Sequence, residues 1–597
     1  MEKFLLKHEV LLVVVIMSLA CLSALLNFDF AYKDTDNYMR ALRIIDLVNT
    51  KEWSETLFLQ SNYPFGETLH WTRFVDVLWL GMALPLFFVL DVRDSIFYSG
   101  MYFSPVMMVL TAVAIVYVLR PYTSLLPRIF ALVVFAIQMP VHFIFAWGRP
   151  DHHSLLALLA VVSVALVLGF FRDNRKGQIA GAGVLCGLMS FIAAEGLLFT
   201  SLVCAVFGLF WLLWGEKRAL DALISFTFAF LITITLSVLV NPPLEGYGFA
   251  DNGRLSVLQI TIAVLGLLAL MLFERMGLTS FKAKICAVLC AGAAIAGIIL
   301  YLFGEGILIS PIDSYLYEIW GHRVSELRSV LTAVDFFIFI FVPLVSLVVL
   351  WKLLREQAFD KKVLVFIGVL LLGYTVLTAY VVRFAVYVAV LDVLPLALFV
   401  GYRLKKSDFY KSKKAPVPDN VMGFMLMIFF AALLCPDAAL LASFNEKQIM
   451  NSRLFNNQEN NEDEQKIDIA SLHYFLAGRD GAVLTDTFLG PEVMWRTGRN
   501  VVGTPYHRNR EGIIDTHTIF FTTDMDEAKK LLLKHKVTDL FLPLQYDEKY
   551  YQKPKENTDK LYGKVYTGEG LPDWLVPVPE AKTGEKSGFM LYRVVLF

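Results

Sequence analysis

The sequence predicts a polytopic α-helical membrane protein with about 13 transmembrane helices and a C-terminal extracytoplasmic α/β domain. Of 597 residues, 57% are hydrophobic and only 18% are charged, against about a quarter in soluble domains. Many apolar runs approach the length of about 20 residues that a transmembrane helix needs. Lys and Arg collect in alternate connections between these runs, as they do in cytoplasmic loops. The net charge of −1 gives no reason to expect nucleic acid as a partner.

The first expected span covers residues 10–26 and follows Lys3 and Lys7, so we expect its N-terminus in the cytoplasm. No good small-x-small cleavage site precedes Asn27, which favours a retained helix over a signal peptide. Further spans are expected at 96–119, 127–146, 154–171, 178–195, 197–214, 221–240, 255–273, 283–302, 333–352, 363–381, 384–401 and 420–441.

One more apolar run, 74–91, is not expected to cross the membrane. Pro85 interrupts it, and Arg73 and Asp76 stand at its start. The Lys- and Arg-rich connections fall on one side of the membrane only if this run stays on the outer side. We therefore expect a re-entrant or interfacial helix here and a C-terminal tail outside the membrane. The absence of cysteine after Cys435 favours the cytoplasmic (inner) membrane of a prokaryote.

The expected domain organisation follows from these boundaries. Residues 1–441 form the membrane domain, with outer loops at 28–95 and 303–332. Residues 442–465 are a polar linker rich in Asn, Asp and Glu. In the remaining residues, 466–597, strands are expected at 482–484, 540–542 and 589–595, and an amphipathic helix at 526–536. That alternation predicts a small α/β domain with its own core.

Two acidic residues, Asp34 and Asp36, follow the first span directly. Carboxylates at this spacing can hold a divalent cation, because hard cations take oxygen ligands. The alternative is a solvated turn in which an Asp caps the next helix.

A second polar cluster, Asp151-His152-His153, follows Arg149 and Pro150 between the third and fourth spans. Carboxylate and imidazole together suit Mn²⁺ or Zn²⁺, and carboxylate suits Mg²⁺. The alternative is a helix start in which Asp151 is the cap and the histidines lie at the membrane interface. The expected topology places this cluster and the Asp34–Asp36 pair on the same outer face, which favours a metal site.

Two further charged residues are candidates. Glu326 lies in the aromatic-rich outer loop 303–332, where a single Glu can also be an ordinary surface residue. Arg383 stands between two spans at their outer ends, where a charge among apolar residues is costly unless it has a partner. Its planar guanidinium suits a phosphate group. The alternative for Arg383 is a side chain that reaches the outer interface.

These residues resemble the motifs of GT-C membrane glycosyltransferases, in particular the catalytic subunit of oligosaccharyltransferase and its single-subunit bacterial and archaeal relatives. In that family thirteen spans precede an extracytoplasmic domain. Asp36-Asn37-Tyr38 matches a D-x-Y motif that binds metal and engages the acceptor. Asp151-His152-His153 matches the archaeal D-H-H form of a second motif. Val324-Ser325-Glu326 fits the end of a third, with Arg323 in place of Ser or Thr.

The resemblance implies roles for individual residues. Asp36, Asp151 and His153 would hold Mn²⁺ or Mg²⁺, and Asp36, Asp151 and Glu326 would be catalytic. Arg383 would contact the lipid-linked phosphate. We predict that the remaining substrate-binding residues are Asp34, Tyr38, Arg149 and His507.

The chain departs from the family at W-W-D-Y-G, the motif that reads the Ser or Thr of an Asn-x-Ser/Thr acceptor. The corresponding stretch, 483–490, keeps the strand and Gly490 but has neither the tryptophan pair nor the tyrosine. The polar stretch 503–509, which contains His507, is either a replacement acceptor surface or a solvated loop.

The implied function is a metal-assisted glycosyltransferase that moves a sugar or oligosaccharide from a polyprenyl-(pyro)phosphate donor to a protein, glycan or lipid acceptor on the outer side. Membrane lipids would be the other partners. A first alternative is a GT-C enzyme that transfers one sugar to a lipid, a glycan or a Ser/Thr side chain. A second is a polytopic transporter or flippase, although no inverted repeat is visible. A third is a non-catalytic scaffold or receptor.

Overall fold

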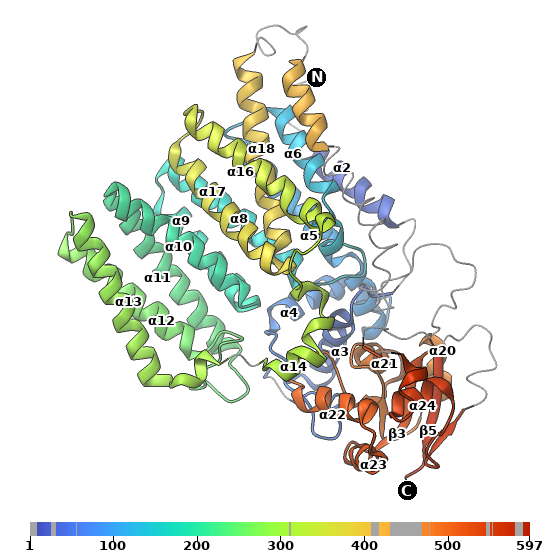
Figure 1. Ribbon diagram of the computed structural model, residues 1–597. Helices are drawn as coiled ribbons and strands as arrows, with labels where there is room; N and C mark the ends of the chain where they lie inside the picture. The colour runs from blue at the N-terminus through green and yellow to red at the C-terminus, as the bar shows by residue number, and fades with distance from the viewer. Residues whose placement is uncertain are drawn as a thin grey trace.

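The computed structural model describes residues 9–25, 31–54, 57–309, 312–407, 417–429, 469–476, 478–544, 550–551, 553–578 and 589–596. The predicted linker 442–465 lies outside these ranges. Long helices form one part of the molecule, and the C-terminal domain, orange to red in Figure 1, forms the other. Helices α3, α4 and α14 lie between the two parts (Figure 1).

Within the described ranges, nine helical stretches are long and apolar enough to cross a membrane. This confirms a polytopic α-helical membrane protein. The nine are α5 (Val92–Leu119), α8 (His152–Asp173), α10 (Glu195–Trp214), α11 (Lys217–Val240), α12 (Val257–Met276), α13 (Phe281–Phe303), the stretch Ala333–Arg355, α17 (Lys361–Tyr380) and the stretch Val382–Lys406. The stretch Ala333–Arg355 comprises α15 (Ala333–Phe336), the π-helical segment η5 (Phe337–Phe341) and α16 (Val342–Arg355). The stretch Val382–Lys406 comprises η6 (Val382–Phe384) and α18 (Ala385–Lys406).

The other predicted spans are shorter helices where the structure describes them: α2 (Glu9–Leu25), α6 (Leu125–Ile137), α9 (Lys176–Ile192) and Asp419–Phe429. The total of thirteen spans therefore stays a prediction. The segment 74–91 is the short helix α4 (Arg73–Ala83) followed by the 3-10 turn η1 (Leu84–Phe88). At about 1.5 Å per residue, α4 is much shorter than the hydrocarbon layer, in keeping with the expected segment that does not cross.

The predicted span 127–146 is not continuous. Helix α6 ends at Ile137, and a short helix, α7 (Met139–Ile144), begins after the extended residue Gln138. Pro140 explains the break, because its ring would clash with the carbonyl four residues earlier in a continuous helix. The side-chain amide of Gln138 donates to the Asp392 carboxyl at 3.1 Å and to the Ala389 carbonyl at 3.3 Å. These two hydrogen bonds to α18 stabilise the break, and α7 contributes residues to the candidate site.

Asp392 is fully buried in α18, so its loss should be felt in stability. We expect Asp392→Ala to lower the free energy of unfolding by about 1–3 kcal/mol, because the side-chain amide of Gln138 then loses one of its two buried acceptors. Asp392→Asn keeps a carbonyl oxygen and should lose less. Thermal unfolding of the detergent-solubilised protein measures both variants. An alanine variant as stable as the asparagine variant would contradict this role.

The outer loops fold into short elements. The first contains α3 (Thr35–Thr50) before α4, and α4 is tied to it by Asp76, which is fully buried among Arg40, Arg43 and Arg73 at 3.2–3.4 Å. The second outer loop contains η2 (Glu305–Leu308), α14 (Ser314–Ile319), η3 (Gly321–Arg323) and η4 (Ser325–Leu327).

The C-terminal domain has a five-stranded sheet with the order β2-β1-β3-β5-β4. Strand β1 (Ala482–Leu484) is parallel to β2 (Asn500–Val501) and β3 (Val537–Pro543), whereas β5 (Phe589–Val594) is antiparallel to β3 and β4 (Leu575–Pro577). The three predicted strands are therefore confirmed, and the predicted helix 526–536 is α23 (Met525–Lys534). The other helices are α20 (Ile469–Leu476), α21 (Gly490–Thr497), α22 (Arg510–Phe521), η8 (Pro554–Glu556) and α24 (Leu561–Thr567).

The first outer loop docks on this domain along its edge strand. The Val501 amide donates to the Gln60 carbonyl at 2.8 Å, and the Tyr63 amide donates to the Val501 carbonyl at 3.2 Å. Helix α21 packs on α3, and α22 packs on α14. A buried polar group reinforces the contact: the Thr504 hydroxyl donates to the Glu67 carboxyl at 2.7 Å. Residues 503–509 are thereby held against the outer loops.

The Glu67 carboxyl predicts a pH dependence of stability. Burial raises its pKa from 4.5 to about 8, against the opposing effect of hydrogen bonds from Thr504 and Ser61. Because the folded chain then binds the proton more tightly than the unfolded chain, this group's contribution to stability is present at low pH and is lost as the pH rises from about 4.5 to 8. We expect the wild-type Tm to fall relative to that of Glu67→Gln between pH 6 and 8. Parallel Tm curves for the two proteins would contradict the prediction.

Candidate active site

A cavity of about 510 Å³ lies where the membrane helices, both outer loops and the C-terminal domain meet. Its walls combine residues that are far apart in the sequence. They are 34–36 and 70–72 from the first outer loop, His152 from α8, 190–195 from the α9–α10 connection, 253–254, Ile312, Trp320 and 323–327 from the second outer loop, Arg383, and Phe488 and 505–507 from the C-terminal domain.

The backbone brings the two acidic motifs together at Gly148. The Gly148 carbonyl accepts hydrogen bonds from the Lys33 amide at 2.9 Å and from the Asn37 side chain at 3.4 Å. Gly148 itself adopts a positive φ of 69°, a conformation that glycine reaches without strain. The chain before α3 is thus fastened to the chain before α8, which explains why the Asp34–Asp36 pair lies beside Asp151.

The Asp151-His152-His153 cluster begins α8. The two oxygens of Asp151 each contact one imidazole, at 2.6 Å from Nδ1 of His152 and at 2.6 Å from Nδ1 of His153. One ligand atom from each of the three residues falls within 4.8 Å of the others, and all three side chains are buried. Asp151 occupies the position before the first helical residue, but its side chain makes no cap hydrogen bond. The cap interpretation therefore does not account for the carboxylate.

Asp34 and Asp36 both line the cavity. Asp34 caps α3 by accepting from the Asp36 amide at 3.1 Å, and it also lies 3.4 Å from Arg149. Asp34 is therefore a helix cap, as the alternative interpretation predicted, whereas Asp36 does not cap the helix. Burial, followed by the negative charges of Asp34, Asp151 and Glu326, holds the pKa of Asp36 well above its usual value. Repulsion of this kind is what a bound cation would relieve.

Arg149 lies at the centre of the acidic residues. Its side chain is only 1% exposed and lies 2.6 Å from Glu326, 3.4 Å from Asp34 and 3.6 Å from Asp151. The guanidinium also stacks 3.8 Å above the Phe143 ring of α7. One buried cation therefore holds carboxylates from three separate segments around one point.

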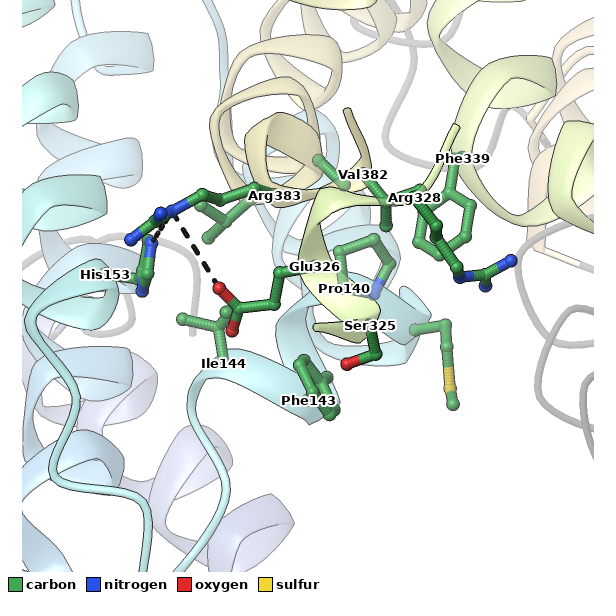
Figure 2. A pocket seen from close by; sticks show the side chains of 13 residues that line it. Pro140, Phe143, Ile144, His153, Ser325, Glu326, Arg328, Phe339, Val382 and Arg383 are labelled. Atoms are coloured by element: carbon green, nitrogen blue, oxygen red, sulfur yellow. Dashed lines mark hydrogen bonds and ion pairs between the residues drawn. The ribbon is translucent and has the colours of Figure 1, made fainter. Parts of the chain in front are cut away.

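Arg383 closes the other side of the cluster. Its Nε lies 2.5 Å from Glu195 and 3.8 Å from Glu326, and 3.0 Å from Nε2 of His153. Figure 2 shows Arg383, His153 and Glu326 converging beside an apolar pocket. Glu195 also accepts from the Tyr387 hydroxyl at 3.1 Å. The sequence analysis did not predict Glu195, although a carboxylate at the outer end of an apolar run was a signal that could have found it.

The predicted residues fall into three groups. Asp34, Asp36, Glu326, Arg383 and His507 line the cavity. Asp151, Arg149 and His153 do not line it but contact lining residues: His152, Glu326 and Arg383 respectively. His152 takes the lining position instead of His153. Tyr38 is not brought to the cavity.

Tyr38 is buried at the interface with the C-terminal domain. Its hydroxyl donates to Glu492 at 3.2 Å and lies 3.4 Å from Arg496, both in α21. The prediction that Tyr38 binds substrate therefore has no geometric support here, because the side chain joins α3 to α21.

The charges of the site fit a divalent cation. Five carboxylates and two guanidinium groups meet in the cluster, which leaves three negative charges in excess when every carboxylate is ionised and both histidines are neutral. Carboxylate oxygens with imidazole nitrogens form a donor set that Mn²⁺ and Zn²⁺ accept readily.

No protein-family model matches the chain. No curated protein matches it either.

Solved structures do match. The archaeal oligosaccharyltransferase AglB from Archaeoglobus fulgidus, in complex with an inhibitory peptide and a dolichol-phosphate, superposes with a TM-score of 0.69 at 14% identity, covering 94% of this chain and 72% of that chain. The apo form of the Archaeoglobus fulgidus oligosaccharyltransferase gives 0.68 at 14% identity, with 94% and 71% covered. Its complex with Zn and sulfate gives 0.62 at 14% identity, with 93% and 71% covered.

The identity is low, so the likeness establishes the fold. It confirms, over 94% of this chain, the fold that the resemblance implied. The chain has the fold of the archaeal oligosaccharyltransferase.

Proposed function

We propose that this protein is a GT-C glycosyltransferase that moves a sugar or oligosaccharide from a polyprenyl-(pyro)phosphate donor to an acceptor at the extracytoplasmic face of the membrane. One observation carries the proposal. Asp36, His152, Glu326 and Arg383 line one cavity at the junction of helices, outer loops and C-terminal domain. Asp151 contacts His152, and His153 contacts Arg383. The shared fold with an oligosaccharyltransferase supports the same class of reaction.

Asp36, Asp151 and one or both histidines would hold the cation. His152 is the stronger candidate than the predicted His153, because His152 faces the cavity. His153 instead contacts Asp151 with one nitrogen and Glu195 with the other, at 3.2 Å. When bound, Mn²⁺ or Mg²⁺ would act as a Lewis acid on the phosphate of the leaving group. A solved structure of the same fold in complex with Zn and sulfate supports a bound metal.

The apolar pocket in Figure 2 gives the donor lipid a place. Its wall is formed by α7 residues such as Phe143 and Ile144, by Phe339 of η5, and by Val382, Ala385 and Val386. Arg383, His153 and Glu326 stand at its polar end. A polyprenyl chain would pack on the apolar wall while Arg383 contacts the phosphate through its planar guanidinium. A solved structure of the same fold in complex with a dolichol-phosphate supports a lipid-linked donor.

Asp36 and Glu326 would orient the acceptor. Both carboxylates line the cavity, where fixed placement of a nucleophile contributes more than basicity. The acceptor's attacking oxygen or nitrogen would form the bond to the anomeric carbon of the sugar and pass its proton to the Asp36 or Glu326 carboxylate, and the phosphate would leave with the bonding electrons. Arg383 would neutralise the charge that develops on that phosphate.

One observation favours transfer to an acceptor other than an Asn-x-Ser/Thr peptide. Where the related enzymes carry the acceptor motif, Asp486 is engaged within the chain by Arg323 at 2.8 Å and by the Tyr551 hydroxyl at 3.2 Å. The second candidate function is therefore transfer of a sugar to a lipid, a glycan or a Ser/Thr side chain.

The test is consumption of a lipid-linked sugar by the purified protein, with Mn²⁺ and with EDTA. We expect metal-dependent loss of undecaprenyl-phosphate or undecaprenyl-pyrophosphate sugars when an acceptor mixture is present, and mass spectrometry of the product separates peptide, glycan and lipid acceptors. Movement of the lipid-linked sugar across a vesicle membrane without chemical change would instead support the transporter alternative. Chemically intact donors in every mixture would overturn the proposal.

A further inference from the structure

Three aromatic side chains from three segments form an uncharged group in the same cavity. His70 comes from the first outer loop, Trp320 from the second and His507 from the C-terminal domain, and all three line the cavity. The ring centroids of His70 and His507 are 4.9 Å apart, and those of Trp320 and His507 are 6.5 Å apart. We call these residues the imidazole–indole cluster.

Two polar atoms of this cluster are buried and have no hydrogen-bond partner within the described ranges. They are Nε1 of Trp320 and Nδ1 of His70. Trp320 is only 6% exposed. Buried polar atoms are nearly always hydrogen-bonded, so their lack of a partner indicates that something bound in the cavity completes them. The indole nitrogen can only donate, whereas a neutral imidazole offers one donor and one acceptor.

The group that fits here is neutral. Burial, followed by the charge of Arg508, lowers the pKa of His507 to about 4. Burial and the neighbouring His507 and Arg508 hold the pKa of His70 well below its usual value. Both imidazoles are therefore uncharged at neutral pH. A phosphate or carboxylate would instead require a cationic partner at this point.

Three arginines around the cluster are engaged within the chain: Arg254 and Arg323 in the cavity lining, and Arg508 beside His507, which pairs with Asp251. The Arg254 side chain donates to the carbonyls of Asn241 and Pro242 at 3.1 and 3.3 Å. Arg323 pairs with Asp486 at 2.8 Å. The cluster therefore presents flat ring faces with unpaired donors and acceptors, and the ionic groups lie with Asp36 and Arg383.

We propose that the imidazole–indole cluster binds a neutral sugar ring, with the C–H face of the sugar against the aromatic rings and its hydroxyl groups on Trp320 and His70. This inference rests on the proposed function and specifies which part of the substrate the cavity recognises. The sugar belongs either to the lipid-linked donor or to a glycan acceptor, because both present the same ring and hydroxyl chemistry.

A peptide fits this place less well. One mode of peptide binding adds a strand to a free sheet edge. At the edge strand β2 of the C-terminal domain that place is already taken by Gln60 and Tyr63 of the first outer loop. A sugar needs no such edge.

The experiment compares Trp320→Phe with Trp351→Phe in the full-length protein in nanodiscs. Trp320→Phe removes the Nε1 donor and keeps a ring, whereas Trp351 is 56% exposed on α16 and serves as the matched control. The probes are methyl glycosides of glucose, galactose, mannose and N-acetylglucosamine, undecaprenyl phosphate, and undecaprenyl phosphate carrying each of these sugars. We expect at least one sugar-bearing probe to bind about 5- to 10-fold more weakly to Trp320→Phe, the loss expected for one hydrogen bond.

The probes distinguish the two sources of the sugar. Weaker binding of a sugar-bearing undecaprenyl phosphate, with unchanged binding of undecaprenyl phosphate, assigns the ring to the donor. Weaker binding of a methyl glycoside in saturating undecaprenyl phosphate assigns it to the acceptor. His507→Phe, on the C-terminal domain, repeats the test if Trp320→Phe does not fold.

The inference is overturned if no sugar binds the wild type, or if every sugar binds the cluster variants and Trp351→Phe alike. Metal-dependent consumption of the donor that persists in that case would leave the proposed function standing without this subsite. Sugar binding that depends on Trp320 in a protein that consumes no donor would leave the subsite standing and remove the proposed function.

Discussion

Asp151→Ala is expected to abolish transfer, lowering kcat/KM by about 100-fold or more, because a Lewis acid is worth several kcal/mol and each 1.4 kcal/mol is tenfold in rate. Asp151 is the residue that both histidines contact, at 2.6 Å each. Its removal takes away one predicted ligand and also frees the imidazoles that it orients. The loss should appear in transfer assays and as a parallel loss of Mn²⁺ affinity.

Asp526→Asn is the matched control for that experiment. Asp526 is an exposed residue in the first turn of α23, so its substitution removes the same charge far from the cavity. Asp151→Asn adds a finer comparison, because it keeps the size of the side chain and changes its charge. Turnover by Asp151→Ala within tenfold of the wild type would remove Asp151 from the catalytic site.

The sequence predicted the acidic residues of the site because charge is scarce in this chain and stands out at the ends of apolar runs. Asp36 and Asp151 were found this way, and the Lys and Arg pattern placed them on one face. Their close approach depends on the hydrogen bonds to the Gly148 carbonyl, a tertiary contact without a local sequence signal. Glu195 was missed because it lies between two apolar runs that read as successive spans.

The lack of a local sequence signal also explains why the position of Tyr38 and the shortest strands were not predicted. Tyr38 stands in the motif with Asp36, but a helix directs residues two apart to different faces, so Tyr38 meets α21 instead of the cavity. Strand β2 has only two residues. Strand β4 has three and ends at Pro577, a residue that argues against a strand, whereas the equally short β1 is wholly apolar. Strands β2 and β4 become visible only through their partners in the sheet. Local pattern thus predicted β1, β3 and β5, and long-range pairing determined the rest.

Arg149→Met should destabilise the protein by about 3–5 kcal/mol, the usual loss when one partner of a buried ion pair is removed. The side chain is 1% exposed, and its removal leaves Asp34, Asp151 and Glu326 facing one another without it. Thermal unfolding in EDTA measures the effect, since a bound cation would mask part of the repulsion. Arg510→Met is the control: it breaks an exposed pair with Asp313 at 2.8 Å, which is worth about 0–1 kcal/mol.

A second substitution separates lost packing from uncompensated charge. Glu326→Gln in the Arg149→Met background removes one of the carboxylates that have lost their arginine partner, so we expect the double variant to regain part of the lost Tm. In the wild-type background, Glu326→Gln should lower the Tm. Such opposite signs are the mark of direct coupling between neighbours. The double variant should still fail to transfer sugar, because Glu326 then lacks the charge proposed to orient the acceptor. Equal Tm shifts for Arg149→Met and Arg510→Met would mean that the acidic residues do not need Arg149 to share one cavity.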